Sequence, residues 1–120
     1  MSLTDNIEKA RKKVIAADLD GTLTNIRYIP GFWEMTMKEL GDYYLTLSPN
    51  NDIKRKINNL YDNGFTINIF TSRWDLYKPQ TKKWLEQNEV KYHELQMNKP
   101  FYDFIIDDKA IELNNIERIK

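Results

Sequence analysis

The stretch from Val14 to Gly21 constrains the fold more than any other part of the chain. An unbroken apolar run, Val14 to Ala17, leads into two carboxylates one residue apart, Asp18 and Asp20, and then a glycine. A short run of this kind, with β-branched residues and a turn directly after it, is typical of a strand buried on both faces of a sheet. Ligands of open parallel sheets bind at the carboxyl ends of the strands. We therefore expect Asp18 and Asp20 to lie at a ligand site.

Two carboxylates this close repel each other by about 1 to 4 kcal/mol, depending on the local dielectric constant. A fold keeps such a pair only if positive charge neutralises it, and Mg²⁺ is the common partner of an all-oxygen site. An Asp-Leu-Asp-Gly sequence alone is, however, more often a polar turn after a strand. The rest of the chain must decide between these two interpretations.

Composition narrows the chemistry. The length of 120 residues suits one domain, expected over residues 13–120, after a polar segment, residues 1–12, that is either a tail or a short helix. Basic and acidic residues balance at 18 each, so no net charge attracts nucleic acid or an anionic membrane. No apolar run could span a bilayer and the amino terminus is polar, so we expect a cytoplasmic protein. The absence of cysteine and the single histidine, His93, exclude thiolate chemistry and any site that needs two histidines.

The later segments alternate between helical and strand patterns. Caps and apolar spacing predict helices that begin at Ser48-Pro49 and at Lys78-Pro79, and short apolar runs predict strands over residues 65–70, 90–93 and 104–106. A weak closing helix is expected at the end of the chain. This alternation predicts an α/β fold, a Rossmann-like, doubly wound parallel sheet in a three-layer α/β/α arrangement.

Residues 25–47 carry many aromatic side chains without a clear period. They could form core, a subunit interface of a homo-oligomer, or a platform that covers a substrate. Arg27 and Trp33 are candidate substrate contacts in this segment. Arg73 is another candidate, although a structural pairing with a nearby carboxylate would explain it equally well.

Polar residues follow the other predicted strands as well. Thr71 and Ser72 follow the second strand, Lys99 precedes the fourth, and Asp107 with Asp108 follows the fourth. Because the carboxyl ends of parallel strands meet at one edge of a sheet, we expect these groups to converge on the first pair of carboxylates.

Such a cluster suits phosphoryl chemistry. Asp18 and Asp107, with a carbonyl or water from Asp20, could hold Mg²⁺, while Lys99 and the Thr71 hydroxyl contact a phosphate dianion. Asp18 could attack phosphorus to give an aspartyl-phosphate, and Asp20 could protonate the leaving alcohol and later activate water. Backbone amides of the turn after Asp18 could add donors for the phosphoryl oxygens.

Four short motifs in this order resemble those of the haloacid dehalogenase-like (HAD) superfamily, whose commonest members are phosphatases: Asp18-x-Asp20-Gly21-Thr22, Thr71-Ser72, Lys99-Pro100 and Asp107-Asp108. The resemblance covers residues 13 to about 111. It implies that Asp18 is the nucleophile and Asp20 the acid/base. It further implies that Thr71 binds phosphate, that Lys99 binds both phosphate and the nucleophile, and that Asp107 is a Mg²⁺ ligand. Asp108 would then hold metal-bound water.

The intervals between the motifs leave no room for a separate cap domain, so the chain looks like a capless member. The sequences around Thr71-Ser72-Arg73 and Lys99-Pro100 are similar to small phosphatase-like proteins of bacterial surface-polysaccharide synthesis. The resemblance implies a Mg²⁺-dependent phosphatase acting on a small phosphorylated molecule, a sugar phosphate or a nucleotide.

Two alternatives place other functions on a similar fold. A phosphoacceptor signalling domain of the response-regulator type also has a carboxylate cluster, a threonine and a Lys-Pro. In that family the acidic pair comes early and the Lys-Pro last, whereas here Lys99-Pro100 precedes Asp107-Asp108. The other alternative is a binding subunit that has kept the fold and lost turnover.

Overall fold

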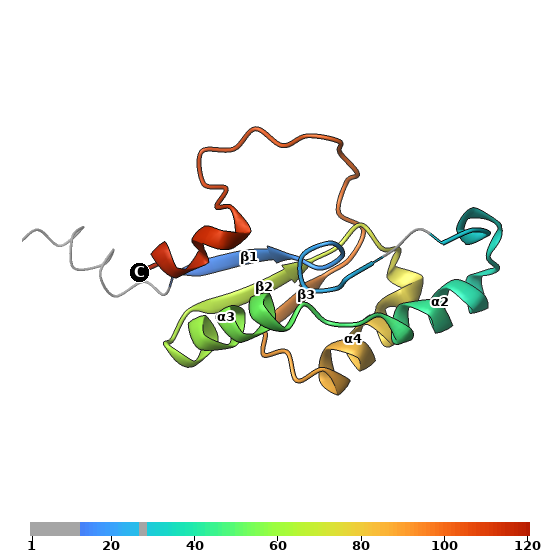
Figure 1. The fold of residues 1–120 in the computed structure, drawn as a ribbon, viewed down its shortest axis with the longest axis horizontal. Helices are drawn as coiled ribbons and strands as arrows, with labels where there is room; N and C mark the ends of the chain where they lie inside the picture. Colours follow the sequence, from blue (N-terminus) through green and yellow to red (C-terminus); the bar gives the residue numbers. More distant parts are fainter. Residues whose placement is uncertain (1–12, 27–28) are drawn as a thin grey trace, which may run out of the picture.

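The computed structural model describes residues 13–26 and 29–120, and the predictions for residues 1–12 and for Arg27 lie outside these ranges. Its sheet has three parallel strands in the order β1-β2-β3, flanked by helices (Figure 1). The strands are β1 (Val14–Asp18), β2 (Thr66–Phe70) and β3 (Glu94–Gln96). The helices are α2 (Met37–Thr46), α3 (Asn51–Asp62) and α4 (Lys78–Gln87), with 3-10 helices at Phe32–Glu34, Asp75–Tyr77 and Leu113–Arg118. This arrangement is an α/β fold with a Rossmann-like parallel sheet.

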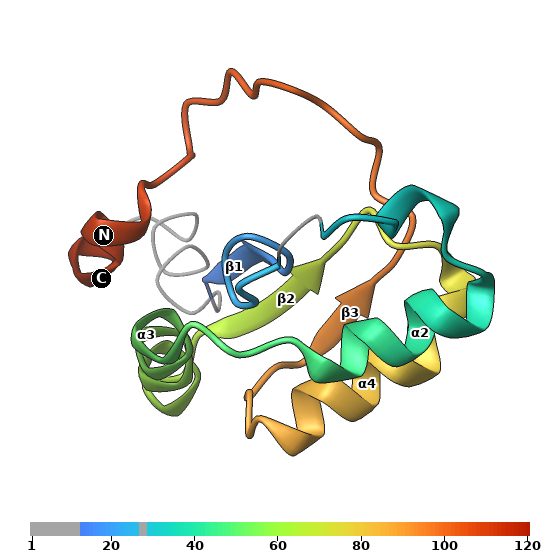
Figure 2. The same ribbon diagram turned by 45° about the vertical axis from the view of Figure 1, so that its right-hand side comes forward.

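The helices cover one face of the sheet, which corrects the prediction of a doubly wound, three-layer arrangement. Both crossovers, β1 to β2 and β2 to β3, step in the same direction, and right-handed crossovers of this kind place their helices on one face. Figures 1 and 2 show α3 and α4 on that face. A second layer of helices, on the opposite face, would require the strand order to reverse with a further strand beside the free edge of β1. The described part of the chain has no strand at that edge.

Burial along β1 follows the same one-sided pattern. Ala17 is buried while its neighbour Ala16 is exposed, and Val14 is 59% exposed. In β2, Ile67 and Ile69 are fully buried on the helical side. The prediction that the first strand is buried on both faces is therefore wrong. Successive side chains of a strand point to opposite faces of the sheet, so every second residue of β1 lies on the uncovered face.

The fourth predicted strand, residues 104–106, does not form. Phe104 and Ile106 are 90% and 101% exposed in an irregular segment that arches away from the sheet between β3 and the last 3-10 helix (Figure 1). At the start of this segment the Lys99 amide donates to the Thr71 carbonyl, just after β2. Beyond its far end, Glu117 of the last 3-10 helix forms an ion pair with Lys56 of α3 at 3.2 Å. A run of three apolar residues forms a strand only if it pairs with a neighbouring strand, which supplies its backbone hydrogen bonds and buries its side chains.

Two predicted helices are present, with small shifts at their ends. The cap of α3 is Asn50, whose side chain accepts from the Ile53 amide at 3.2 Å, rather than Ser48. α4 begins at Lys78 with proline in its first turn, as predicted. β3 starts at Glu94, after the predicted residues 90–93, which connect α4 to the strand.

The segment 25–47 contains a helix that the prediction missed. α2 begins after Thr36, whose side chain and that of Glu39 form a reciprocal capping box. α2 packs on α4 close to Gly41, where a β-carbon would lie 3.2 Å from the Gln80 side chain. Beneath the helices the core is closed by fully buried Leu19, Leu23, Ile67, Ile69, Trp84 and Leu85. None of the helices described here is long and apolar enough to cross a lipid bilayer.

Candidate active site

The turn after β1 holds the two carboxylates at the carboxyl edge of the sheet. Leu19 is fully buried between them, and its carbonyl accepts from the amides of residues 22, 23 and 24 at 3.2, 2.8 and 3.0 Å. Gly21, with φ of 82°, allows the chain to reverse, and its amide donates to the Thr24 carbonyl. These amides are engaged inside the turn, so the predicted backbone donors for phosphate are not available from residues 21 to 24.

Asp20 forms a bidentate ion pair with Arg73. Arg73 Nε donates to Asp20 Oδ2 at 2.9 Å and Nη2 donates to Oδ1 at 2.7 Å. The Thr24 hydroxyl donates to the same Oδ1 at 2.8 Å. Three donors therefore fix the Asp20 carboxylate in one orientation.

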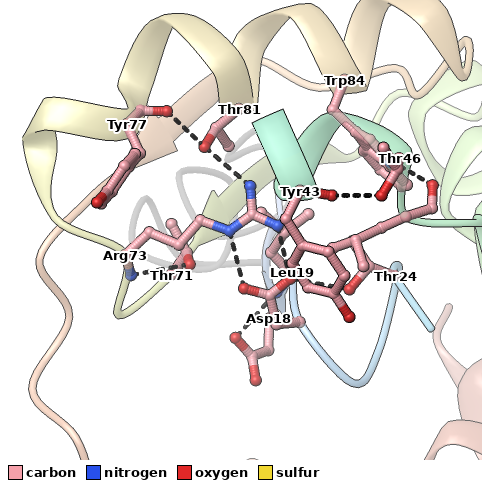
Figure 3. A network of polar contacts seen from close by, with 12 residues as sticks. Asp18, Leu19, Thr24, Tyr43, Thr46, Thr71, Arg73, Tyr77, Thr81 and Trp84 are labelled. Carbon is pink, nitrogen blue, oxygen red and sulfur yellow. Dashed lines mark hydrogen bonds and ion pairs between the residues drawn. The ribbon is translucent and has the colours of Figure 1, made fainter. Parts of the chain in front are cut away.

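Arg73 is itself held on every side. Its Nη1 donates to Thr81 Oγ1 at 3.1 Å, and that hydroxyl donates to the Tyr77 carbonyl at 2.8 Å (Figure 3). The guanidinium carbon lies 3.7 Å from the centre of the Tyr44 ring, and the residue is 5% exposed. Of the two interpretations of Arg73 from the sequence, the structure shows the pairing with a carboxylate.

Asp18 ends β1 with a less complete set of partners. Its Oδ1 accepts from the Leu19 amide at 2.9 Å. Burial raises the pKa of the Asp18 carboxyl above its ordinary value, the Lys99 ammonium and the Leu19 amide oppose that rise, and the Asp20 charge adds to it. Burial therefore outweighs the neighbours that favour the ionised form of Asp18.

Thr71 and Lys99 are joined through the backbone at the ends of β2 and β3. The Lys99 amide donates to the Thr71 carbonyl at 2.9 Å, and the Thr71 hydroxyl, on a residue 1% exposed, accepts from the Arg73 amide at 3.2 Å. Lys99 Nζ lies 4.0 Å from the Phe70 ring centre and donates to Tyr102 Oη at 2.7 Å. The aromatic rings therefore hold in place the Lys99 ammonium, whose charge lowers the pKa of the Asp18 carboxyl.

One cavity of about 530 Å³ gathers these groups. The predicted site residues that line it are Asp18, Asp20, Trp33, Thr71, Ser72, Arg73 and Lys99. Sequence reasoning missed the groups that support them, namely Thr24, Tyr44, Thr81 and Tyr102. Only chain proximity to Asp20 could have indicated Thr24, and the other three come from segments with no motif of their own.

Asp107 and Asp108 lie outside this cavity. Both are exposed in the irregular segment, where Asp107 Oδ1 accepts from the Lys109 amide at 2.8 Å. Within residues 13–26 and 29–120 no three acidic or histidine side chains stand close enough together to hold a metal ion. The Asp20 carboxylate is engaged by Arg73, whereas the metal ligand expected at Asp20 is its backbone carbonyl or a water. Asp107 lies apart from the other two residues, so the Mg²⁺ site expected from Asp18, Asp20 and Asp107 stays a prediction from the sequence.

The fold of the chain is similar to those of several solved structures. No protein-family model matches the chain, and no curated protein sequence matches it. A crystal structure of an MCSG target from Vibrio cholerae is similar with a TM-score of 0.68 at 24% identity, covering 90% of this chain and 89% of that one.

Two further likenesses are to chains in structures of the Pnkp1/Rnl/Hen1 complex and of the Pnkp1/Rnl/Hen1 RNA repair complex. Their TM-scores are 0.56 and 0.58, at 20% and 18% identity. They cover 91% and 89% of this chain but only 35% and 30% of the longer chains. At these identities the comparisons show that the chain shares its α/β fold with all three structures.

Proposed function

We propose that the protein is a phosphatase of HAD-like type, which hydrolyses phosphate monoesters through an aspartyl-phosphate on Asp18. One observation carries the proposal. Asp18, Asp20, Thr71 and Lys99, which come from three separate stretches of sequence, line a single cavity at the carboxyl edge of a parallel sheet. Ligands of such sheets bind at this edge.

The residues divide the work. An oxygen of Asp18 attacks phosphorus, and the bond to the leaving alcohol breaks while Asp20, which must enter this step protonated rather than ionised against Arg73, gives that alcohol its proton. Asp20 then takes a proton from the water that attacks the aspartyl-phosphate and releases inorganic phosphate and free Asp18. The Lys99 ammonium and the Thr71 and Ser72 side chains bind the phosphoryl oxygens, whose charge they offset. Arg73 orients Asp20 by its bidentate pair.

Mg²⁺ dependence, with Asp107 as a ligand and Asp108 next to it, stays a prediction from the sequence. A bound Mg²⁺ would supply positive charge to the phosphoryl group. A titration of the phosphatase rate with Mg²⁺ tests this for the wild type and for Asp107→Asn. We expect the variant to need more Mg²⁺ for half-maximal rate, and identical titration curves would contradict the assignment.

The test of the proposed function is phosphate release from acetyl phosphate, an aryl phosphate, sugar phosphates and nucleotides, with and without Mg²⁺. Asp18→Asn keeps an Oδ1 acceptor for the Leu19 amide, so it should fold and lose turnover by several orders of magnitude. The matched control is Asp42→Asn on the exposed outer side of α2, which should keep the full rate. Near-normal turnover by Asp18→Asn would refute the nucleophile.

A further inference from the structure

The cavity beside the carboxylates is lined by both polar and apolar side chains. Its polar lining includes Asp18, Asp20, Thr71, Ser72, Arg73 and Lys99. Its apolar lining, here called the wall, includes Ile26, Trp33, Met35, Leu40, Trp74 and Phe101. The cavity volume of about 530 Å³ lies within the range of pockets that hold one small organic molecule.

Three of the rings on this wall are exposed although each is large. Trp33 is 82% exposed, Trp74 63% and Phe101 81%. They come from three segments, the first 3-10 helix, the loop after β2 and the loop after Lys99, and they face one cavity. Because burial of a large ring is favourable, exposed rings gathered beside polar anchors indicate a ligand surface.

The two cationic side chains that line the cavity are engaged within the protein. All three guanidinium nitrogens of Arg73 donate to Asp20 or Thr81, and Lys99 Nζ donates to Tyr102. A leaving group rich in hydroxyls would need several donors and acceptors on the wall, because each buried hydroxyl without a partner costs free energy. A flat aromatic group needs only ring faces.

We infer that the cavity selects a phosphate monoester whose alcohol part carries an aromatic ring, with a mononucleotide as its biological form. The phosphate lies at Asp18 and Lys99, and the base packs against Trp33 and Trp74. This inference rests on the proposed function for the position of the phosphate. It separates the nucleotide from the sugar phosphate, which share the same reacting group.

The experiment compares two substrates that differ only in the base: adenosine 5′-monophosphate and methyl β-D-ribofuranoside 5-phosphate. The ratio of their kcat/KM values measures what the base adds. A stacked base contributes about 5- to 150-fold, the equivalent of ~1 to 3 kcal/mol. We expect a ratio in this range for the wild type, a fall toward one in Trp33→Ala and Trp74→Ala, and partial recovery in Trp33→Phe and Trp74→Phe.

Phe104→Ala is the matched control, because Phe104 is 90% exposed and does not line the cavity. It should keep the wild-type ratio. A wild-type ratio near one, or a ratio that survives both alanine substitutions, would overturn the inference. A misfolded variant loses both substrates together, and the phenylalanine variants then carry the comparison.

If no phosphate monoester is turned over, the proposed function fails, and binding still decides the inference. The Kd values of the same two compounds are then measured by calorimetry. Tighter binding of the nucleotide, lost in the alanine variants, supports the aromatic site. Equal Kd values contradict it.

Discussion

The pair between Arg73 and Asp20 makes a quantitative prediction about stability. The Arg73 side chain is 2% exposed and that of Asp20 22%, and they share two hydrogen bonds of 2.9 and 2.7 Å. Breaking a fully buried pair from one side costs about 3 to 5 kcal/mol, because it strands a charge. Water can still reach Asp20, so we expect Arg73→Met to cost about 2 to 4 kcal/mol, including the contact with the Tyr44 ring.

The measurement is a double-mutant cycle by chemical denaturation, with Asp20→Asn, Arg73→Met and the double variant. The double variant strands no charge, so it should be more stable than the sum of the single changes predicts, by about 1.5 to 3 kcal/mol. By thermal unfolding, Arg73→Met alone lowers Tm by roughly 10 to 20 °C. The stability of Arg73→Lys should lie between those of the wild type and Arg73→Met, since an ammonium keeps the charge but cannot form the bidentate contact.

The control is the ion pair of Lys38 and Asp42, in which Nζ lies 3.4 Å from Oδ2. Their side chains are 89% and 66% exposed. Its removal should change stability by less than about 0.5 kcal/mol. If the Arg73 and Asp20 substitutions proved additive, or if Arg73→Met cost no more than the control, the reasoning from burial would be refuted.

Two further predictions concern Asp18. Burial raises the pKa of the folded Asp18 carboxyl, so the folded protein binds this proton more tightly than the unfolded chain, and ionisation of Asp18 costs stability once the pH has risen through the folded pKa. Asp18→Asn should therefore raise the Tm at pH 7 in EDTA, and the gain should shrink as the pH falls through the raised pKa toward the ordinary range; a gain independent of pH would contradict this cause. Lys99 holds the pKa of Asp18 down, so Lys99→Met should move the acid limb of the kcat/KM profile to higher pH, besides weakening phosphate binding. An unmoved limb would show that Lys99 does not act on the carboxyl.

The helices show what local sequence can predict. α3 and α4 follow from apolar spacing, a cap and a proline, all within about a dozen residues. The prediction missed α2, although Thr36 and Glu39 form a capping box, because the aromatic residues of segment 25–47 show no clear helical period. The signals of a helix lie inside the helix, since its hydrogen bonds do.

Strands behave differently. Residues 104–106 have the composition of a strand, yet they lie outside the sheet, because a strand receives its hydrogen bonds from elsewhere in the chain. The one-sided helical cover has the same origin. Strand order decides which face is covered, and no local pattern encodes that order.

The candidate site divides along the same line. Local sequence places Asp18 and Asp20 after one apolar strand and Thr71 after another, and parallel pairing brings such strand ends together at one edge. The pairing of Asp20 with Arg73, a residue 53 positions away, and the aromatic lining of the cavity beside it arise only in the folded chain. Ion pairs and cavity walls join segments that are distant in sequence, and their energies depend on burial, which exists only once the chain has folded.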